Sequence, residues 1–473
     1  MKRFTLSLVL ALLSLASPAG ADIPVETQNL QLRFSEYGDL VSGIACLPNC
    51  SNPDSLKQEF QSYRGFVSVN RDSTVVFELE RVDSQDDILL IFSNKFSNET
   101  RRWRIPHSGW LMSLELVNPQ AMAMASGEAF APPELAGFGA WLESMRYVVF
   151  GESGIMQLGL DEDIEPWRQE SAWLGYRNRF WAAMIRPEQA VLAAFRTGND
   201  QTEAQVDLSP YGPGSIHFQI YAGPVEPGAL RSAHPELEAL MYSGLWFWLG
   251  WICQALFLLL AAVHSMVPNW AVAIIIMSLV VQLVMWPLNR MAERLQDGVH
   301  EKDSRISPRL REIKKQFKGA EQAEKILALY KKENVHPLYS LKSLAGVMVI
   351  IPVFIGAFNM LSENIWLMGE SFLWIKDLSL PDAVYSLPFP IPFLGDTLNL
   401  LPFMMVALSL PASSLRNQGG SDPVLQARNR RNLYLMSMFF FLLFYTFPAG
   451  MVLYWVVNNA VSLLTGLARR LRT

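Results

Sequence analysis

Apolar residues follow two different patterns along this chain. Between residues 22 and 238 they alternate with polar residues or form short runs, and turn residues such as Gly, Pro, Asn and Asp separate these segments. Clear examples begin at Leu30, Ser73, Asp87, Gly109 and Ser215. Alternation with a period of two is typical of half-buried strands. Many such strands predict a β-sandwich-like domain over residues 22–238.

The second pattern, over residues 269–473, consists of long apolar runs. The run from Trp270 to Leu288 is almost unbroken and holds one strongly polar residue, Gln282. A helix that spans a bilayer needs about 20 apolar residues, so this run is long enough. Four further runs, several of them short, occupy residues 345–361, 398–412, 433–447 and 450–467. With residues 270–288 they predict an α-helical membrane bundle of five spans.

Residues 244–264 are also long enough to span, but the charge of a later loop argues against it. The loop from Arg290 to Lys342 is rich in Lys and Arg, and such loops stay in the cytoplasm. If residues 244–264 and the next run both crossed from an external domain, this loop would lie outside. We therefore expect residues 244–264 to form a helix in the outer membrane interface, with three tryptophans at headgroup depth: Trp246, Trp248 and Trp251.

Within the cytoplasmic loop, residues 307–333 show helical spacing of apolar positions on either side of Gly319. They predict a helical hairpin with basic residues facing outward. The simplest interpretation of these charges is a solvated face. The alternative is attraction to anionic lipid headgroups, ribosomal RNA or acidic nascent segments, which the sequence does not separate. Five crossings then take the chain from an external domain to a cytoplasmic C-terminus.

The first 21 residues have the pattern of a secretory signal peptide. Lys2 and Arg3 precede an apolar run, and small residues end at Ala21. The run is shorter than a span, so we expect cleavage after Ala21, with retention as a tilted anchor as the alternative. In both cases the domain that follows is exported.

Composition agrees with a chain divided between water and membrane. Of its 473 residues, 51% are hydrophobic and 18% are charged, which is too apolar for a soluble enzyme and too polar for a wholly membrane-embedded protein. Cys46 and Cys50 lie in the exported part and predict a disulfide rather than a zinc site, because no histidines accompany them. The net charge of −5 is uninformative about nucleic acid.

Enzymatic chemistry finds little support in the exported domain. His107, Glu115, His217 and the acidic run 161–163 are present, but no nucleophile elbow, phosphate-binding loop or metal-ligand spacing joins them. We expect no enzyme, no metal and no cofactor.

Six segments, in their order and spacing, resemble the YidC/Oxa/Alb family of membrane protein insertases, in the Gram-negative form with a large periplasmic domain. They are WLGYRNRFWAAMIRP, NWAVAIII to MWPLNR, LALYKKENVHPL, IPVFIGAFNML, FLWIKDLSLPD and FPAGMVLYWVVNN, which begin at Trp173, Asn269, Leu327, Ile351, Phe372 and Phe447. The resemblance implies a multi-pass protein of the bacterial inner membrane whose N-terminal domain is periplasmic. It also implies nascent membrane proteins and the lipid bilayer as partners, with the Sec translocon and the ribosome as further candidates, and no DNA.

The resemblance further implies a groove, open to lipid and cytoplasm, that receives hydrophilic stretches of an incoming span. By position, the groove would be lined by Gln282, Ser278, Arg290, Asn359 and Asn458. An apolar slide for the hydrophobic part would involve Pro352, Phe354, Phe358, Met436, Phe440 and Phe444. The alternative for the slide residues is packing within the bundle or contact with lipid. The alternative for the asparagines is hydrogen bonding between helices.

One departure from the family concerns the groove itself. Five residues before the proline of the first span the family commonly has an arginine, whereas this chain has Gln282. An amide binds water but does not attract acidic segments by charge. We therefore expect an insertase and chaperone with an altered client range. The alternative is a membrane-anchored periplasmic scaffold or envelope-assembly factor. A transporter is disfavoured, because the predicted spans hold almost no ionisable residues.

Overall fold

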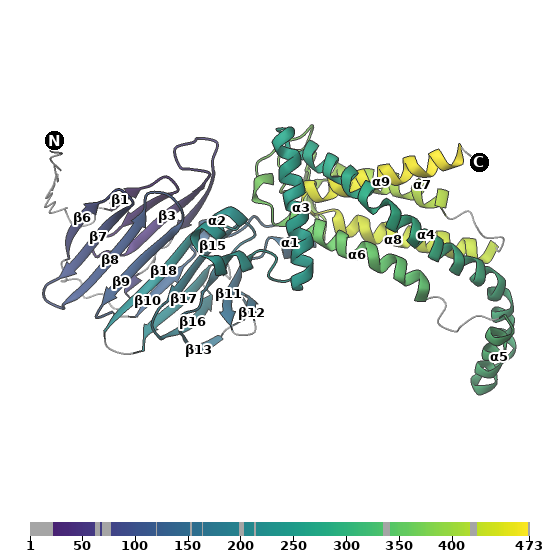
Figure 1. Ribbon diagram of the computed structural model, residues 1–473, viewed down its shortest axis with the longest axis horizontal. Helices are drawn as coiled ribbons and strands as arrows, with labels where there is room; N and C mark the ends of the chain where they lie inside the picture. The colour runs from purple at the N-terminus through teal and green to yellow at the C-terminus, as the bar shows by residue number, and fades with distance from the viewer. Residues whose placement is uncertain are drawn as a thin grey trace, which may run out of the picture. The chain divides into compact units, whose positions relative to one another are not determined.

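The computed structural model describes residues 22–471, apart from 62–66, 69–76, 120, 152–153, 163, 198–202, 212–213, 334–340 and 417–422 (Figure 1). The predicted signal peptide therefore lies outside the described residues. The chain divides into two compact units. The β unit comprises Met1–Glu134 and Glu143–Gly244, and the helical unit comprises Leu135–Leu142 and Leu245–Thr473.

The largest sheet of the β unit has nine antiparallel strands in the order β12-β11-β14-β15-β18-β9-β8-β7-β6. These strands are β6 (Glu78–Asp83), β7 (Asp87–Asn94), β8 (Glu99–Pro106), β9 (Leu111–Val117), β11 (Arg146–Gly151), β12 (Gly154–Gly159), β14 (Leu174–Arg177), β15 (Trp181–Pro187) and β18 (Ser215–Pro224). In β7 every second residue is buried, which is the alternation that predicted a strand there.

Two smaller sheets complete the β unit. One holds β1 (Ile23–Glu26), β2 (Leu30–Phe34), β3 (Leu40–Leu47) and β4 (Leu56–Gln61) in that order. The other has the order β13-β16-β17-β10-β5 and consists of β5 (Val67–Ser68), β10 (Met122–Ala125), β13 (Ile164–Gln169), β16 (Val191–Thr197) and β17 (Ala204–Pro210).

Aromatic side chains pack the smaller sheets against the nine-stranded sheet. The ring of Phe34 on β2 lies 5.2 Å from that of Trp103 on β8, and the ring of Tyr147 on β11 stacks on Phe195 of β16 at 4.3 Å. Burial of large rings contributes strongly to such a core. The prediction of a β-sandwich-like domain is confirmed.

Short helices close one side of this core. They are η1 (Glu128–Phe130), α2 (Pro227–Ala233) and η2 (Pro235–Leu240). Leu230 and Leu237 are fully buried in one cluster with Trp173, which directly precedes β14, and with Tyr221 of β18. Helices α2 and η2 therefore pack on the hydrophobic core of the nine-stranded sheet.

The helical unit contains α1 (Gly139–Leu142), α3 (Phe247–Met266), α4 (Trp270–Gln316), α5 (Gly319–Lys332), α6 (Leu341–Ser362), η3 (Ile365–Leu367), β19 (Tyr385–Ile391), β20 (Gly395–Leu398), α7 (Leu400–Arg416), α8 (Pro423–Phe444) and α9 (Ala449–Arg470). Among the described residues, three helices are long and apolar enough to cross a membrane: Phe247–Met266, Trp270–Ala292 and Ala449–Arg470. Ile351–Ser362 and Leu400–Leu415 are shorter apolar helices.

One helix runs further than expected. The first arm of the hairpin was predicted to begin as a new helix at Ser307, but α4 continues without interruption from Trp270 to Gln316, through Pro287 and Pro308. A proline removes one backbone hydrogen bond and bends a helix without always ending it. The reversal comes only at Gly319, whose φ of 66° favours glycine, and α5 follows.

Candidate functional site

The candidate groove starts from the apolar part of α4. Asn269 begins the helix, because its side chain accepts a hydrogen bond from the backbone N–H of Val272 at 3.0 Å. Buried residues then recur at helical spacing, at Ile274, Met277, Ser278, Val281 and Met285. This spacing is one face of a helix packed on its neighbours. Gln282 lies at the edge of that face and is half-buried.

Gln282 has a partner on the last helix of the chain. Its Nε2 donates a hydrogen bond to Oδ1 of Asn458 on α9, with a distance of 2.9 Å. Asn458 also shares a hydrogen bond with the hydroxyl of Tyr454, one turn earlier on α9. Two amides therefore join α4 to α9 within otherwise apolar surroundings, and neither carries a charge.

Within the part of the chain that the structure describes, no hydrogen bond joins the other predicted groove residues to this pair. Ser278 is fully buried, and its hydroxyl donates to the carbonyl of Ile274 on its own helix at 2.7 Å. Asn359 donates to the carbonyl of Ile355, also on its own helix, at 2.8 Å. The guanidinium of Arg290 lies 4.0 Å from the ring centre of Trp286, in cation–π geometry.

Most of the predicted slide residues form an aromatic cluster around Trp455 of α9. The rings of Phe354, Phe440 and Phe444 lie 4.7, 5.7 and 5.4 Å from that of Trp455. Phe358 contacts the cluster through Phe447 at 5.4 Å. The cluster thus connects α6, α8 and α9, and Phe444 is only 1% exposed.

The two remaining slide residues lie differently. Pro352 is half-buried on α6, whereas Met436 on α8 is 58% exposed. The structure therefore brings the aromatic members together as packing within the bundle and leaves Met436 on the outer surface of the unit.

Sequence reasoning did not find the residues that hold the start of α7. Oδ2 of Asp382 accepts hydrogen bonds from the backbone N–H groups of Leu400 and Leu401, at 2.8 and 3.0 Å, and from Nε1 of Trp374 at 3.0 Å. Asp382 thus acts as an N-cap from 18 residues upstream. A cap normally lies next to its helix, so no local sequence signal marks this one.

The β unit contains the predicted disulfide and the histidines that were considered as catalytic candidates. Cys46 and Cys50 are joined by a disulfide. Nε2 of His107 lies 2.9 Å from the carbonyl oxygen of Ser84, and His217 lies 3.9 Å from Glu115. No group of three or more potential metal ligands occurs in the part of the chain that the structure describes.

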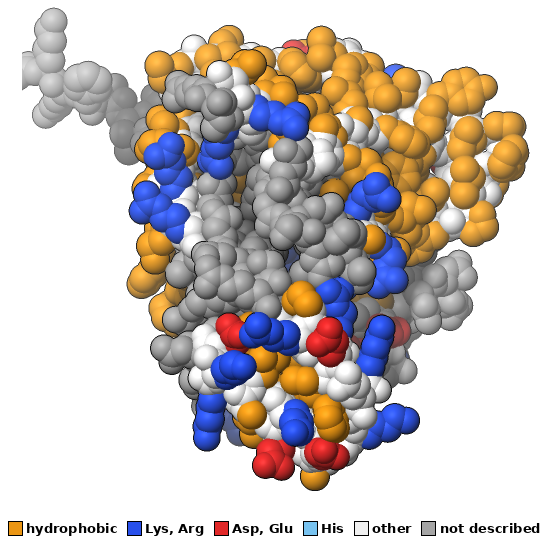
Figure 2. All heavy atoms as spheres, turned by 90° about the vertical axis from the view of Figure 1, so that its right-hand side faces the viewer, with side chains coloured by type: hydrophobic (Ala, Val, Ile, Leu, Met, Phe, Trp, Pro, Cys, Tyr) orange, Lys and Arg blue, Asp and Glu red, His pale blue; other side chains and the backbone are white. Residues whose placement is uncertain are grey.

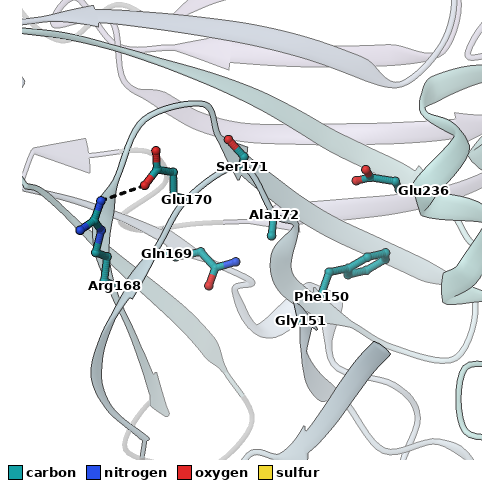
Figure 3. A pocket seen from close by; sticks show the side chains of 8 residues that line it. All are labelled: Phe150, Gly151, Arg168, Gln169, Glu170, Ser171, Ala172 and Glu236. Atoms are coloured by element: carbon teal, nitrogen blue, oxygen red, sulfur yellow. Dashed lines mark hydrogen bonds and ion pairs between the residues drawn. The ribbon is translucent and has the colours of Figure 1, made fainter. Parts of the chain in front are cut away.

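The β unit also has an open polar cavity of about 550 Å³ (Figure 3). Phe150 and Glu236 lie on one side of it, and Arg168 and Glu170 lie on the other side, where they form an ion pair at 2.9 Å. The cavity has the size of a small peptide or ligand site.

Comparison with known proteins bears directly on the helical unit. The family described as 60Kd inner membrane protein matches residues 262–470. Proteins named "Membrane protein insertase YidC" match a larger part of the chain. The one from Janthinobacterium sp. (strain Marseille) is 28% identical over 343 residues, which cover 68% of this chain and 58% of that protein. Residues 262–470 thus match an inner-membrane protein family, and the chain is similar to YidC insertases over about two thirds of its length.

Other YidC relatives give a consistent result. The protein from Methylobacillus flagellatus is 27% identical over 71% of this chain and 56% of its own length, and the one from Cupriavidus metallidurans is 31% identical over 62% and 47%. This chain thus spans a little over half of the length of the first curated relatives it matches. A solved structure of active YidC insertase covers 95% of this chain and 93% of its own at 16% identity, with a TM-score of 0.36.

Similarity to inner-membrane proteins and the apolar helices together support an inner-membrane protein. Gln282, at the position where the sequence resemblance led us to expect an arginine, lies on α4 in the apolar part of the helical unit. Its neutral hydrogen bond to Asn458 joins two side chains of different helices, α4 and α9.

Proposed function

We propose that this chain is a membrane protein insertase and chaperone that inserts inner-membrane proteins and helps them fold. Support comes from relatives named as insertases and from the paired amides of Gln282 and Asn458 in an apolar bundle. The amide pair is the observation that carries the proposal, because polar side chains at membrane depth are costly unless they serve packing or a pathway. Its clients are nascent membrane proteins, with the Sec translocon and the ribosome as further partners.

The proposed topology has five crossings, by α4, α6, α7, α8 and α9. The β unit is periplasmic, α3 lies in the outer interface, and the arms of α4 and α5 together with the C-terminus are cytoplasmic. Charge supports this arrangement, since Lys and Arg gather at the end of the helical unit where α5 lies (Figure 2). The course of α3, steeply inclined to α4 and α6, supports an interfacial helix (Figure 1).

In the proposed mechanism, a hydrophilic stretch of a client enters beside α4 and exchanges hydrogen bonds with the amides of Gln282 and Asn458. Because both amides donate and accept, they replace the water that the client loses. Neither attracts a carboxylate by Coulomb force, so clients with acidic segments gain less here than from an arginine. The aromatic cluster around Trp455, about one turn before Asn458 on α9, packs α6 and α8 against α9.

A photo-crosslinking experiment tests this function. A photoreactive residue replaces Gln282 in one variant and Leu283 in the control, because Leu283 is the next residue of the same helix and is 73% exposed. Stalled nascent chains of an inner-membrane protein should crosslink to position 282 and much less to position 283. Equal capture at both positions, or none at 282, contradicts the proposal.

Client choice has its own test. In cells depleted of their main insertase, the wild type should insert a client with a neutral translocated segment and should insert an acidic version poorly. The Gln282→Arg variant should improve the acidic client alone. If both proteins handle both clients identically, the altered client range is wrong while insertase activity stands.

The alternative function is a periplasmic scaffold for envelope assembly, anchored by the helices. The cavity lined by Phe150, Gln169 and Glu236 favours it, because such a site suits a bound peptide (Figure 3). Partners crosslinked only from Ser171 at this cavity, with none from position 282, would favour the scaffold.

A further inference from the structure

Exposed aromatic side chains gather at the end of the helical unit where α7 and α9 begin. The hairpin of β19 and β20 lies there and leads directly into α7. Tyr385 and Phe389 are 61% and 63% exposed, and Phe393 in the turn is 48% exposed. Residues 385–398 contain no Lys, Arg or His, and Asp396 is their one acid. Clustered exposed rings of this kind mark an interaction surface.

A distant segment of the chain adds to the same surface. Leu135–Leu142 belongs to the helical unit although the strands on both sides of it belong to the β unit. Phe138 packs edge-to-face on Phe393 with ring centres 5.0 Å apart, and the backbone N–H of Gly139 donates to Oγ1 of Thr446 at 2.9 Å. Trp141 then remains 60% exposed.

Glycine is required where this segment makes its contact. A Cβ at Gly139 would overlap the carbonyl oxygen of Thr446, between α8 and α9. The neighbouring Ala140 is exposed, so its side chain points away from that contact. The segment is therefore held by a close backbone approach at Gly139, which a larger residue would prevent.

Buried polar groups fix the base of the hairpin. Asn399 donates through Nδ2 to the carbonyl of Tyr445 at 2.7 Å and accepts from the backbone N–H of Ala383 at 3.0 Å. The hydroxyl of Tyr445 donates to the carbonyl of Thr397 at 3.0 Å. Because the base is rigid, the exposed rings are held outward by the fold.

We propose that the β19–β20 hairpin and Leu135–Leu142 form one lipid-docking surface that enters the headgroup region of the bilayer. The surface is continuous with the membrane bundle, since α7 begins two residues after β20 ends. Aromatic side chains favour this region, where rings meet apolar chains and polar groups meet water. The absence of basic residues indicates apolar insertion rather than attraction to anionic headgroups.

The length of α7 also supports lipid as the partner of this surface. Its 17 residues extend about 26 Å at 1.5 Å per residue, less than the roughly 30 Å of a hydrocarbon core. An apolar hairpin at its beginning supplies the missing depth. The location in the inner membrane suffices for this proposal, which does not depend on insertase activity.

Depth-dependent fluorescence quenching tests the docking surface in the full chain. Phe389→Cys is made in a Cys253→Ser background, labelled with the environment-sensitive dye NBD, and reconstituted in vesicles of phosphatidylethanolamine and phosphatidylglycerol. Lipids with a doxyl group near the headgroup should quench most of the emission, and aqueous iodide should quench little. Phe96→Cys, at a 95% exposed ring of the β unit, is the reference for a water-exposed label.

Two outcomes overturn the proposal. Strong iodide quenching without doxyl quenching at position 389 means that the hairpin lies in water. Shielding from both quenchers, which increases with the protein-to-lipid ratio, means that a second copy covers the surface.

A second pair of variants tests whether the distant segment shares the surface. With the label at Trp141→Cys, Gly139→Val should abolish doxyl quenching, whereas the matched Ala140→Val should leave it unchanged. The label at position 389 should be unaffected in both. If Gly139→Val leaves the label at position 141 in lipid, the joint surface of the two segments is wrong.

Discussion

The hydrogen bond between Gln282 and Asn458 predicts a measurable coupling between α4 and α9. The perturbation is a double-mutant cycle of Gln282→Leu and Asn458→Leu. Leucine is close to glutamine in volume, is larger than asparagine and is compatible with a membrane helix. Each single variant therefore removes the same hydrogen bond without opening a cavity. The cycle subtracts the effects that each leucine has elsewhere.

The geometry determines the expected size of this coupling. The 2.9 Å distance from Nε2 to Oδ1 is that of a well-formed hydrogen bond. Hydrogen bonds between membrane helices contribute about 0.6 kcal/mol on average and up to about 1.7, because polar groups also find partners in the unfolded state. With RT near 0.59 kcal/mol, the coupling corresponds to about a 3-fold to 18-fold change in the unfolding equilibrium.

The assay is reversible unfolding of the full protein in bicelles, followed for the wild type, both single variants and the double variant. Asn459 provides the control, because it is adjacent on α9 but donates to the carbonyl of Met405 on α7 at 3.2 Å. A cycle of Gln282→Leu with Asn459→Leu should show no coupling. If the Gln282–Asn458 coupling is equally absent, the two amides are solvated separately and the tie between α4 and α9 is refuted.

Three further predictions concern stability. Asp382→Ala leaves three hydrogen-bond donors without their acceptor and should lower the unfolding free energy by about 1–3 kcal/mol, as thermal denaturation would measure. Asp396→Ala, at an exposed position, should have almost no effect in that assay. Arg101→Met removes the buried ion pairs of Arg101 with Asp39 and Glu99 and should cost about 3–5 kcal/mol. Arg81→Met, in an exposed ion pair, should cost less than about 1 kcal/mol. Burial raises the pKa of Tyr176 well above its ordinary value, so as the pH rises the phenol ionises in the unfolded state before it does in the folded state. The free energy of unfolding should therefore fall above about pH 10, and it should fall less steeply in Tyr176→Phe. Denaturant titrations at a series of pH values would measure both slopes.

Local patterns were enough to predict the classes of structure. Alternating burial identified strands that begin near Leu30, Asp87 and Ser215, because a strand with one buried face must alternate. Long apolar runs identified the helical unit, because a spanning helix must bury its backbone polar groups. Both signals act over a few residues, so a single sequence contains them.

Contacts between distant residues could not be predicted in this way. Gln282 and Asn458 are 176 positions apart, and nothing near either residue indicates the other. The capping of α7 by Asp382 and the contact of Gly139 with Thr446 are further cases. The error at Pro308 has another cause. A new helix was expected there, but α4 continues, because the hydrogen bonds of the neighbouring helical turns outweigh the one that proline removes.

In the proposed mechanism, the neutral amide pair and the short helices address one physical problem, which is the passage of a hydrophilic segment through an apolar layer. On the proposed topology, the apolar part of α8 runs from Leu433 to Phe444, and its 12 residues extend only about 18 Å. Arg430 and Arg431 precede this stretch and are exposed, so they reach headgroups readily. A bilayer of about 30 Å must thin beside such a helix, which shortens the apolar path for any hydrophilic segment. The energetic barrier to insertion then falls without a positive charge at position 282, and a neutral amide there is compatible with an insertase.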